Sequence, residues 1–321
     1  MKRLFAFVLI LSLLTACAGA SSAQSGVEGG GFPAASADSS ALLSSSESEP
    51  EPAPSPGILS IDRDTVPQGG VALLRVSGAP AGTTARAETD MGYTPVFFEL
   101  DGDLCAYLPA RYMLDPGEFS VTVYWGEEVQ TLAFTVTDAG FETQTFSVPV
   151  EEEMDMSAAN AEFEAATRPV KDSADPELYW DGSFAAPLAE RPLRVSSSFG
   201  YTRIINGNSS RHGGVDFAAA FDTPVYAPAR GRVLYSGFLT LTGHTVCIEH
   251  GFGLKTWYYH MNARSVEAGT MVEAGAQIGL VGSTGYSNGS HLHFAATVYG
   301  AFVNPMQWFS PELLEQVVYL E

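Results

Sequence analysis

Short apolar runs separated by glycine and proline recur from Ile58 to the C terminus, and they limit the folds open to this chain. Runs of this length that are rich in valine, isoleucine and aromatic residues are typical of β-strands. In the first half they lie at 71–76, 95–100, 119–124 and 131–136. In the second half they lie at 232–235, 245–249, 254–259, 277–281 and 291–298. Helical periodicity is nearly absent from the second half, so we expect a mainly β protein.

The strands fall into two groups. Residues 58–140 are expected to form an immunoglobulin-like β-sandwich, because turn residues punctuate the strands at a suitable spacing. No specific motif marks it, and its role as a spacer or a binding module stays open. Residues 141–190 form a connector with a short helix at 154–166, followed by irregular chain. Residues 191–321 form a second β domain, with a short helix at 311–318 that Ser310 would cap.

The N terminus carries an export signal. Lys2 and Arg3 precede an apolar stretch, 4–14, that is too short to span a bilayer. The sequence Leu-Thr-Ala-Cys at 14–17 resembles the lipobox of bacterial lipoproteins, which implies a signal peptide at 1–16 and a lipid anchor on Cys17. The alternative is a plain secretory signal with an incidental cysteine. Residues 17–57 are rich in Ser, Pro and Glu and are expected to form a disordered tether.

The charge is negative and unevenly distributed. The chain has a formal net charge of −21; residues 1–180 hold 27 acidic and 8 basic residues, and residues 181–321 hold 10 and 8. The acidity therefore belongs to the N-terminal half. No basic patch of the kind that nucleic-acid-binding proteins use is present, so we expect no nucleic-acid partner.

Cysteines offer no metal site of their own. Cys105 and Cys247 lie in different expected domains, and we expect both to be single buried thiols. The chain has no Cys-x-x-Cys motif. A metal ion would therefore be held by histidines and carboxylates.

All six histidines lie between residues 212 and 293, and this clustering is the main chemical signal. His212 and Asp216 are four residues apart around two glycines, which disfavour a helix; in an extended segment both would share one face. His291 and His293 share one face of a strand in the same way. His260 ends a third apolar run.

Two imidazoles and a carboxylate suit catalytic zinc, which takes three protein ligands and leaves a position for water. Further histidines can handle protons near neutral pH. The helical His-Glu-x-x-His signature is absent, and the glycine-rich stretch 282–290 lacks the ending of a phosphate-binding loop. We expect His244 and His250 to be structural.

Residues 211–304 resemble the lysostaphin-type, or LytM-like, zinc endopeptidases of peptidoglycan. The matching stretches lie at 212–217, 223–228, 231–233, 258–261, 281–285 and 291–294. The resemblance implies a LytM-like antiparallel β-sheet peptidase domain with a groove. It also implies one Zn²⁺ per chain, with His212, Asp216 and His293 as ligands and with His291 and His260 as catalytic histidines.

The resemblance further implies a reaction. Zinc would activate a water molecule, His291 would act as general base, and His260 would bind the oxyanion or orient the water. Which histidine has which role stays open. Departures from the family pattern include Tyr259, where glycine or alanine is usual, and Ala295, where an acidic residue is common. None removes a ligand.

The sequence therefore predicts an extracytoplasmic endopeptidase that is anchored to the membrane at Cys17, faces the cell wall and acts on peptidoglycan peptides as a monomer. Two alternatives come from other classes: a non-catalytic LytM-like protein that activates a wall amidase, and a wall-binding scaffold lipoprotein. Acidic residues of the connector could also reach the metal and hold the enzyme latent.

Overall fold

The computed structural model describes residues 56–146, 155–171, 173–180, 182–205 and 208–320. Contacts join the described residues in one unit, Pro54–Glu321. Cys17, the export signal and nearly all of the predicted tether lie outside the described residues, as do Glu151 to Glu153 of the connector. Among the described residues, no helix is long and apolar enough to cross a membrane.

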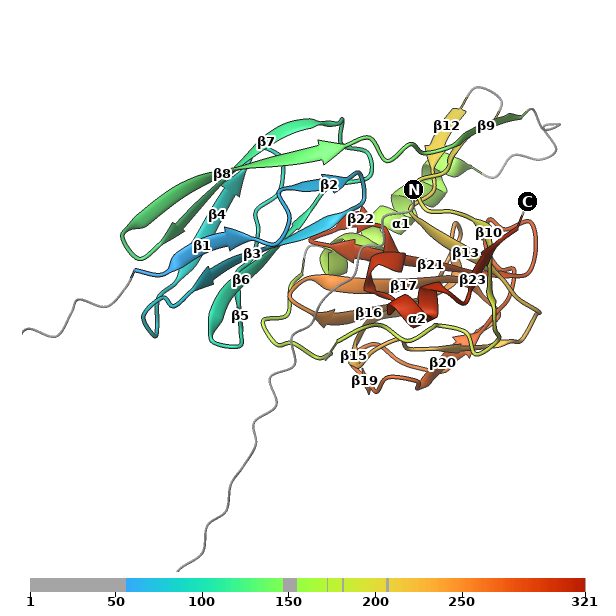
Figure 1. The fold of residues 1–321 in the computed structure, drawn as a ribbon. Helices are drawn as coiled ribbons and strands as arrows, with labels where there is room; N and C mark the ends of the chain where they lie inside the picture. Colours follow the sequence, from blue (N-terminus) through green and yellow to red (C-terminus); the bar gives the residue numbers. More distant parts are fainter. Residues whose placement is uncertain (1–55, 147–154, 172, 181, 206–207, 321) are drawn as a thin grey trace, which may run out of the picture. The chain divides into compact units, whose positions relative to one another are not determined.

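Residues 58–137 form two four-stranded sheets (Figure 1). The first sheet has the order β1 (Ile58–Ile61), β3 (Val71–Ser77), β6 (Asp103–Pro109), β5 (Phe98–Leu100). The second has the order β2 (Thr65–Pro67), β8 (Glu128–Thr137), β7 (Gly117–Trp125), β4 (Ala85–Thr89). Only the β2–β8 pair is parallel. All four strands expected in this part of the chain are present, although β5 is shorter than the run at 95–100.

The two sheets share one apolar core. Leu74 and Leu108 from the first sheet and Val123 and Phe134 from the second are fully buried in the same cluster. Every second residue of β7 from Val121 onward is buried, which is the alternation of a strand with one face on a core. That this pair of sheets is immunoglobulin-like stays a prediction.

A larger, nine-stranded sheet lies in the second half of the chain. Its strands follow in the order β19 (Met271–Val272), β15 (Gly231–Leu239), β16 (Gly243–Gly251), β17 (Leu254–Met261), β21 (His291–Val298), β13 (Gly214–Ala218), β10 (Leu193–Ser197), β23 (Val317–Tyr319), with β22 (Ala301–Val303) paired to β21. All pairs are antiparallel except β10–β23. The chain is therefore mainly β, as the sequence predicts.

Two small sheets flank the large one. One has the order β14 (Pro224–Tyr226), β20 (Gln277–Leu280), β18 (Ala263–Arg264). The other has the order β12 (Asn208–Arg211), β11 (Thr202–Ile205), β9 (Thr143–Phe146), and it joins the connector to the chain just before the first predicted ligand. Arg211 then donates to the carbonyl of Tyr112 (2.6 Å), which ties this point to the N-terminal sheets.

The connector helix α1 spans Met156–Lys171, so it starts close to the predicted position but runs past the predicted end at residue 166. Asp155 caps it by accepting a hydrogen bond from the Ala158 N–H (3.0 Å). Pro169 lies inside its last turn, where Thr167 and Lys171 are buried and bonded to Phe163 O and Glu164. Packing of this turn therefore outweighs the local cost of the proline.

The C-terminal helix is shorter than predicted. After the 3₁₀ helix η1 (Pro305–Trp308), α2 spans only Pro311–Leu314, with Ser310 capping it through the Leu313 N–H (3.2 Å). Val317 and Val318, which were expected to be helical, belong to β23 and pair with β10. Two valines followed by tyrosine favour a strand, and an open sheet edge supplies the partner.

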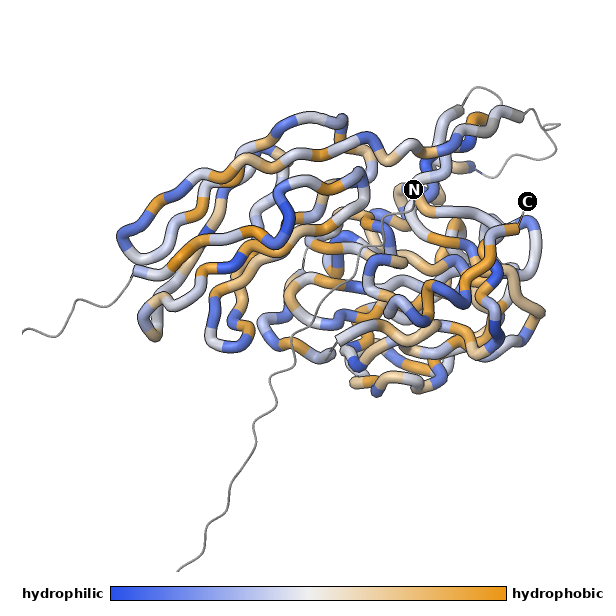
Figure 2. Tube along the Cα trace, in the orientation of Figure 1, coloured by the Kyte–Doolittle hydropathy of each residue, from blue (hydrophilic) through white to orange (hydrophobic). Residues whose placement is uncertain are grey.

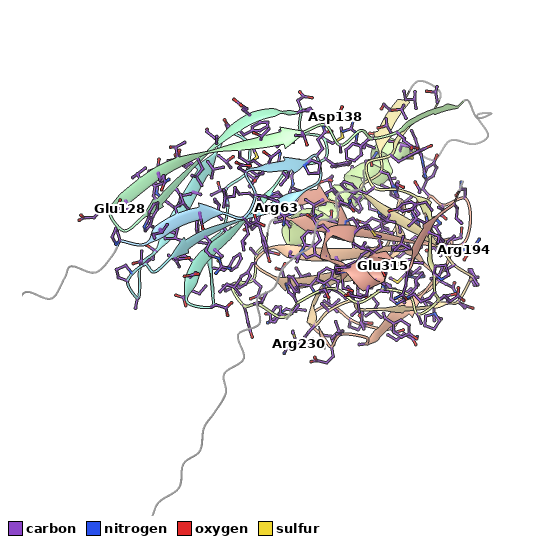
Figure 3. All side chains as sticks on the ribbon, viewed as in Figure 1. Arg63, Glu128, Asp138, Arg194, Arg230 and Glu315 are labelled. Carbon is purple, nitrogen blue, oxygen red and sulfur yellow. The ribbon has the colours of Figure 1, made fainter. Side chains whose placement is uncertain are left out.

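The large sheet has two different faces. Val215 and Phe217 of β13 and Leu292 and Phe294 of β21 point into the main core. The residues between them, with Asp216 and His293, point to the opposite face. Figure 2 shows polar and apolar residues interspersed along the strands. Charged side chains such as Glu128 and Arg194 lie at the surface (Figure 3).

Candidate metal centre

Strand register places two of the predicted ligands side by side. β13 pairs with β21 so that Asp216 faces His293 and Ala218 faces His291. His212 precedes β13 and is separated from it by Gly213 alone. Gly214 starts the strand where an added Cβ would lie 2.7 Å from His293 Nε2, so only glycine lets the two strands carry this histidine here.

The three side chains converge on one point. His212 Nε2 lies 3.0 Å from Asp216 Oδ1 and 2.9 Å from His293 Nδ1, and His293 Nδ1 lies 2.8 Å from Asp216 Oδ1. Among the described residues these three form a group that could hold a metal ion. Ligand atoms around tetrahedral zinc lie about 3.4 Å apart, so a small outward adjustment would accommodate the ion.

The protonation of His212 fits this arrangement. Its Nδ1 lies 2.9 Å from the carbonyl oxygen of Ser198, which can only accept, so Nδ1 carries the proton. The lone pair of neutral His212 is then on Nε2, the atom that faces Asp216 and His293. A carboxylate and imidazole nitrogens at these distances need a cation among them, either a proton that they share in hydrogen bonds or a metal ion, and the donor set fits a metal ion.

Asp216 is held in its charged form. Burial opposes ionisation of this carboxyl, but hydrogen bonds with His212 and His293 outweigh it and hold its pKa well below the usual value. Arg203 of β11 lies 3.8 Å from Asp216 Oδ2 and donates to Ser197 Oγ (2.9 Å). Asp216 Oδ1 thus faces the two histidines, and the Arg203 guanidinium lies near Asp216 Oδ2.

The two other predicted histidines lie beside this group. His291 Nε2 is 3.7 Å from Asp216 Oδ1, and the ring centroids of His260 and His291 are 4.9 Å apart. His291 Nδ1 lies 2.8 Å from Gly289 O and His260 Nδ1 lies 2.9 Å from Thr284 O. Both carbonyls accept, so each neutral histidine carries its lone pair on Nε2.

His260 reaches this face through an unusual backbone conformation. Strand alternation would send it to the face opposite Tyr259, but His260 has φ 61°, in the left-handed region. Tyr259 and His260 therefore both reach the metal-site face, while Met261 enters the main core. Such a conformation costs about 1–3 kcal/mol and is typical of functional sites.

Burial, helped by the neighbouring His293 and His291, lowers the pKa of His260 to about 3. Burial likewise lowers the pKa of His293. Both imidazoles are therefore neutral around pH 7, which is the form that binds a metal ion or accepts a proton.

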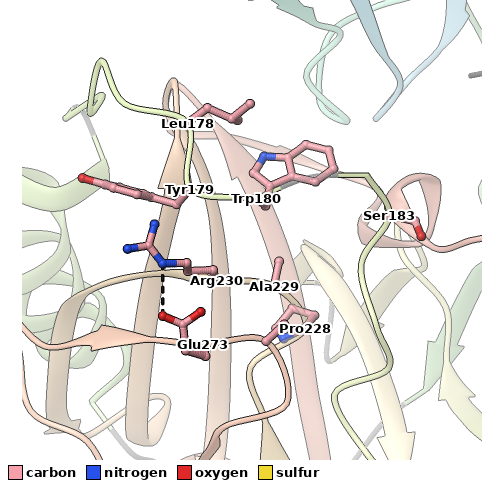
Figure 4. Close-up of a pocket in the computed structure, with 9 residues that line it drawn as sticks. Leu178, Tyr179, Trp180, Ser183, Pro228, Ala229, Arg230 and Glu273 are labelled. Carbon is pink, nitrogen blue, oxygen red and sulfur yellow. Dashed lines mark hydrogen bonds and ion pairs between the residues drawn. The ribbon is translucent and has the colours of Figure 1, made fainter. Parts of the chain in front are cut away.

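The remaining histidines lie elsewhere on the sheet. His250 is fully buried between the carbonyl of Arg230 and Thr256 Oγ1, and His244 accepts a hydrogen bond from Arg264 (3.3 Å). Cys105 and Cys247 are free and buried, as predicted. A pocket between the connector and the sheet, shown in Figure 4, is lined by Trp180 and an Arg230–Glu273 ion pair and includes none of the predicted site residues.

Sequence reasoning gave no role to Arg203, to the Ser198 carbonyl or to Tyr259. The first two are recognisable only once β11 and the loop before His212 are folded against the ligands. Tyr259 did carry a signal, because a bulky aromatic residue stands where the resembled family has a small one.

A β-sheet that brings two histidines and an aspartate to one point, with two further histidines beside them, defines a metallopeptidase type of domain. Residues 210–305 match the model of peptidase family M23. This part of the chain is therefore a peptidase M23 domain of the LytM-like kind.

Named relatives support the assignment. The DD-carboxypeptidase/endopeptidase Mpg of Neisseria meningitidis serogroup B is 43% identical over 114 residues, which is 35% of this chain and 26% of that protein. The peptidoglycan DD-endopeptidase ShyC of Vibrio cholerae is 37% identical over 114 residues, again 35% and 26%. The chain thus matches about a quarter of the length of these relatives.

A solved structure matches more of the chain. The crystal structure of a protein from Pseudomonas aeruginosa that is assigned to peptidase M23 covers 76% of this chain and 94% of its own, with 25% identity and a TM-score of 0.59. The likeness therefore extends beyond residues 210–305.

Proposed function

We propose that the protein is a zinc-dependent endopeptidase that hydrolyses peptide bonds of bacterial peptidoglycan. The M23 assignment and the endopeptidase names of the relatives support this reaction class. The observation that carries the proposal is the convergence of His212 Nε2, Asp216 Oδ1 and His293 Nδ1, with His291 and His260 beside them.

A Zn²⁺ ion held by these three side chains would supply polarisation of a water molecule and of the scissile carbonyl. His291 is suited to be the general base, because its Nε2 lone pair faces the ligand group while Nδ1 is fixed on Gly289 O. His260 is neutral and has its free lone pair on Nε2, so it accepts a hydrogen bond from the attacking water and orients it. This favours orientation of the water over binding of the oxyanion.

The experiment uses the purified full chain. The wild type should contain about one zinc per chain and should release peptide fragments from purified peptidoglycan, identified by mass spectrometry. His293→Ala should lose both the zinc and the cleavage, because only two ligands remain. His244→Ala removes a histidine outside the ligand group and should keep both. A wild-type protein without zinc, or with zinc and an unaltered wall, would refute the enzyme and favour the non-catalytic alternatives.

We also propose that the enzyme acts outside the cytoplasmic membrane, anchored through a lipid on Cys17 and facing the wall as a monomer. The peptidoglycan named for the Vibrio relative is an extracytoplasmic substrate, and the Leu-Thr-Ala-Cys sequence at 14–17 supports the anchor. The acidic tether would give the peptidase reach from the membrane.

A further inference from the structure

The aromatic ring of Tyr259 lies flat on the imidazole of His293. Tyr259 and His293 are partners across β17 and β21, their ring centroids are 4.8 Å apart, and the two rings are parallel to within 1°. Tyr259 is 5% exposed, so the contact is made inside the protein. Tyr259 stands where the resembled family has glycine or alanine, and its ring contacts His293, a predicted metal ligand.

The orientation of the His293 imidazole depends on packing more than that of the His212 imidazole does. A metal-binding histidine usually donates its second N–H to a carbonyl or carboxylate, which fixes the ring, and His212 has such a partner in Ser198 O. For His293 Nε2 no hydrogen bond is found in the described part of the chain. That atom instead lies against Gly214, where a Cβ would come within 2.7 Å. The orientation of this ring must come from the surfaces around it.

Tyr259 is itself held from behind by apolar side chains. Phe163 of α1 meets its ring edge-on, with centroids 6.0 Å apart at 87°, and Trp257 lies 6.2 Å away at 61°. These residues form one buried cluster on the metal-site face, together with Leu239, Cys247 and Ala295.

The hydroxyl does not explain the tyrosine. Tyr259 Oη is buried and has no hydrogen-bond partner among the described residues. An unpaired buried hydroxyl is unfavourable. The useful part of this side chain is therefore its flat ring.

We propose that Tyr259 is a positioning residue for the metal centre: its ring, supported by Phe163 of the connector helix, fixes the imidazole of His293 so that Nδ1 points at Asp216 and His212. This inference rests on the proposed metal site. It makes α1, which lies outside the residues matched by the family model, a structural part of that site.

The test is metal affinity of the full chain, measured by competition with a chelator for Zn²⁺, together with the visible absorption of bound Co²⁺. Tyr259→Leu keeps apolar bulk and loses the flat ring; it should weaken Zn²⁺ binding about tenfold or more and alter the Co²⁺ spectrum. Tyr259→Phe keeps the ring and should bind Zn²⁺ within about twofold of the wild type.

Leu239→Ala provides the matched control. Leu239 belongs to the same buried cluster, pairs with Gly243 across the β15–β16 hairpin and is not a predicted ligand, so Leu239→Ala should lower the melting temperature without changing Zn²⁺ affinity. Wild-type affinity in Tyr259→Leu would overturn the inference and leave the enzyme proposal intact. Equal loss of affinity in Leu239→Ala would also overturn it, because general loosening would then be the cause. A wild type that binds no zinc would refute both proposals.

Discussion

The histidines of this chain differ in how many of their ring nitrogens are engaged in hydrogen bonds. Those near the metal centre keep a lone pair directed toward Asp216 or the space beside it. His250 has no such lone pair free: its Nδ1 is 2.9 Å from Arg230 O and its Nε2 is 2.8 Å from Thr256 Oγ1. Burial lowers the pKa of His250 to about 4, so it is a neutral core residue.

The lowered pKa of His250 should make the stability of the folded chain depend on pH. Between about pH 6.5 and pH 4 the unfolded chain carries a proton on His250 that the folded chain does not. The free energy of unfolding should therefore fall as the pH drops through this range, with up to about 1.4 kcal/mol per pH unit from this group.

Urea unfolding of metal-free full chain at about pH 7.5 and about pH 4.5 measures this effect. His250→Gln has no titratable group here, so its unfolding free energy should fall less between the two pH values than that of the wild type. The other histidines titrate in both proteins and cancel in the comparison. Identical pH dependence would show that His250 is not the group responsible.

At the scale of elements, the connector covers part of the sheet face that carries the predicted metal ligands. Phe163 of α1 packs on Tyr259, and further along Lys255 donates to the carbonyl of Ser173. Lys255 is fully buried and pairs with Glu249 at 2.7 Å. The connector therefore packs directly on this side of the sheet.

The acidic residues of α1 do not act as a metal-blocking group. Glu162 accepts a hydrogen bond from the Thr240 N–H (2.9 Å), and Glu164 accepts one from Lys171 (2.8 Å). The latency hypothesis is left with the other acidic residues of the connector, among which Glu151 to Glu153 lie outside the described residues.

Substitution of one residue, Phe163, tests the packing of α1 on the sheet. Phe163 is 8% exposed, and Phe163→Ala should lower the free energy of unfolding by roughly 3–5 kcal/mol, because it removes a large buried ring. Asn160→Ala lies on the exposed face of the same helix and should change it by less than about 0.5 kcal/mol. Urea unfolding measures both. Similar values for the two variants would mean that α1 does not pack as described.

At the scale of the whole molecule, the nine-stranded sheet is tied to the N-terminal sheets next to His212, a predicted metal ligand. Arg211 precedes His212 and donates to Tyr112 O, and Phe98 stacks on Phe252 with centroids 3.6 Å apart. The N-terminal sheets therefore support the loop that carries His212. This gives residues 58–140 a structural role, whatever they bind.

The proposed anchor predicts where the molecule is found in a cell. Wild-type protein expressed in a bacterium that processes lipoproteins should partition into the membrane fraction. Cys17→Ser removes the only thiol at the predicted lipidation site, so it should move the protein to the soluble fraction or leave it uncleaved. Mass spectrometry of the N-terminal peptide reports the acyl chains directly. Equal partitioning of both proteins would favour a plain secretory signal.

The sequence by itself predicted most strands and the three side chains that the structure brings together as a possible metal site. Alternating apolar residues with turns are a local signal, and β17 and β21 follow it closely. The spacings of His212 with Asp216 and of His291 with His293 place each pair on one face without knowledge of the partner strand. The strands and the shared faces depend on near neighbours in the chain, so pattern and spacing were sufficient for them, whereas the choice of His212, Asp216 and His293 as ligands came from the resemblance to the LytM-like endopeptidases.

Tertiary structure decided the rest. It extended α1 through Pro169, because buried contacts outweighed a local breaker, and it turned residues 317–319 into a strand, because β10 offered a free edge. It also brought Phe163, Tyr259 and His293 into one stack from three distant segments. Contacts between segments so far apart in the chain leave no periodic trace in the sequence, and only the folded sheet determines which face each of them meets.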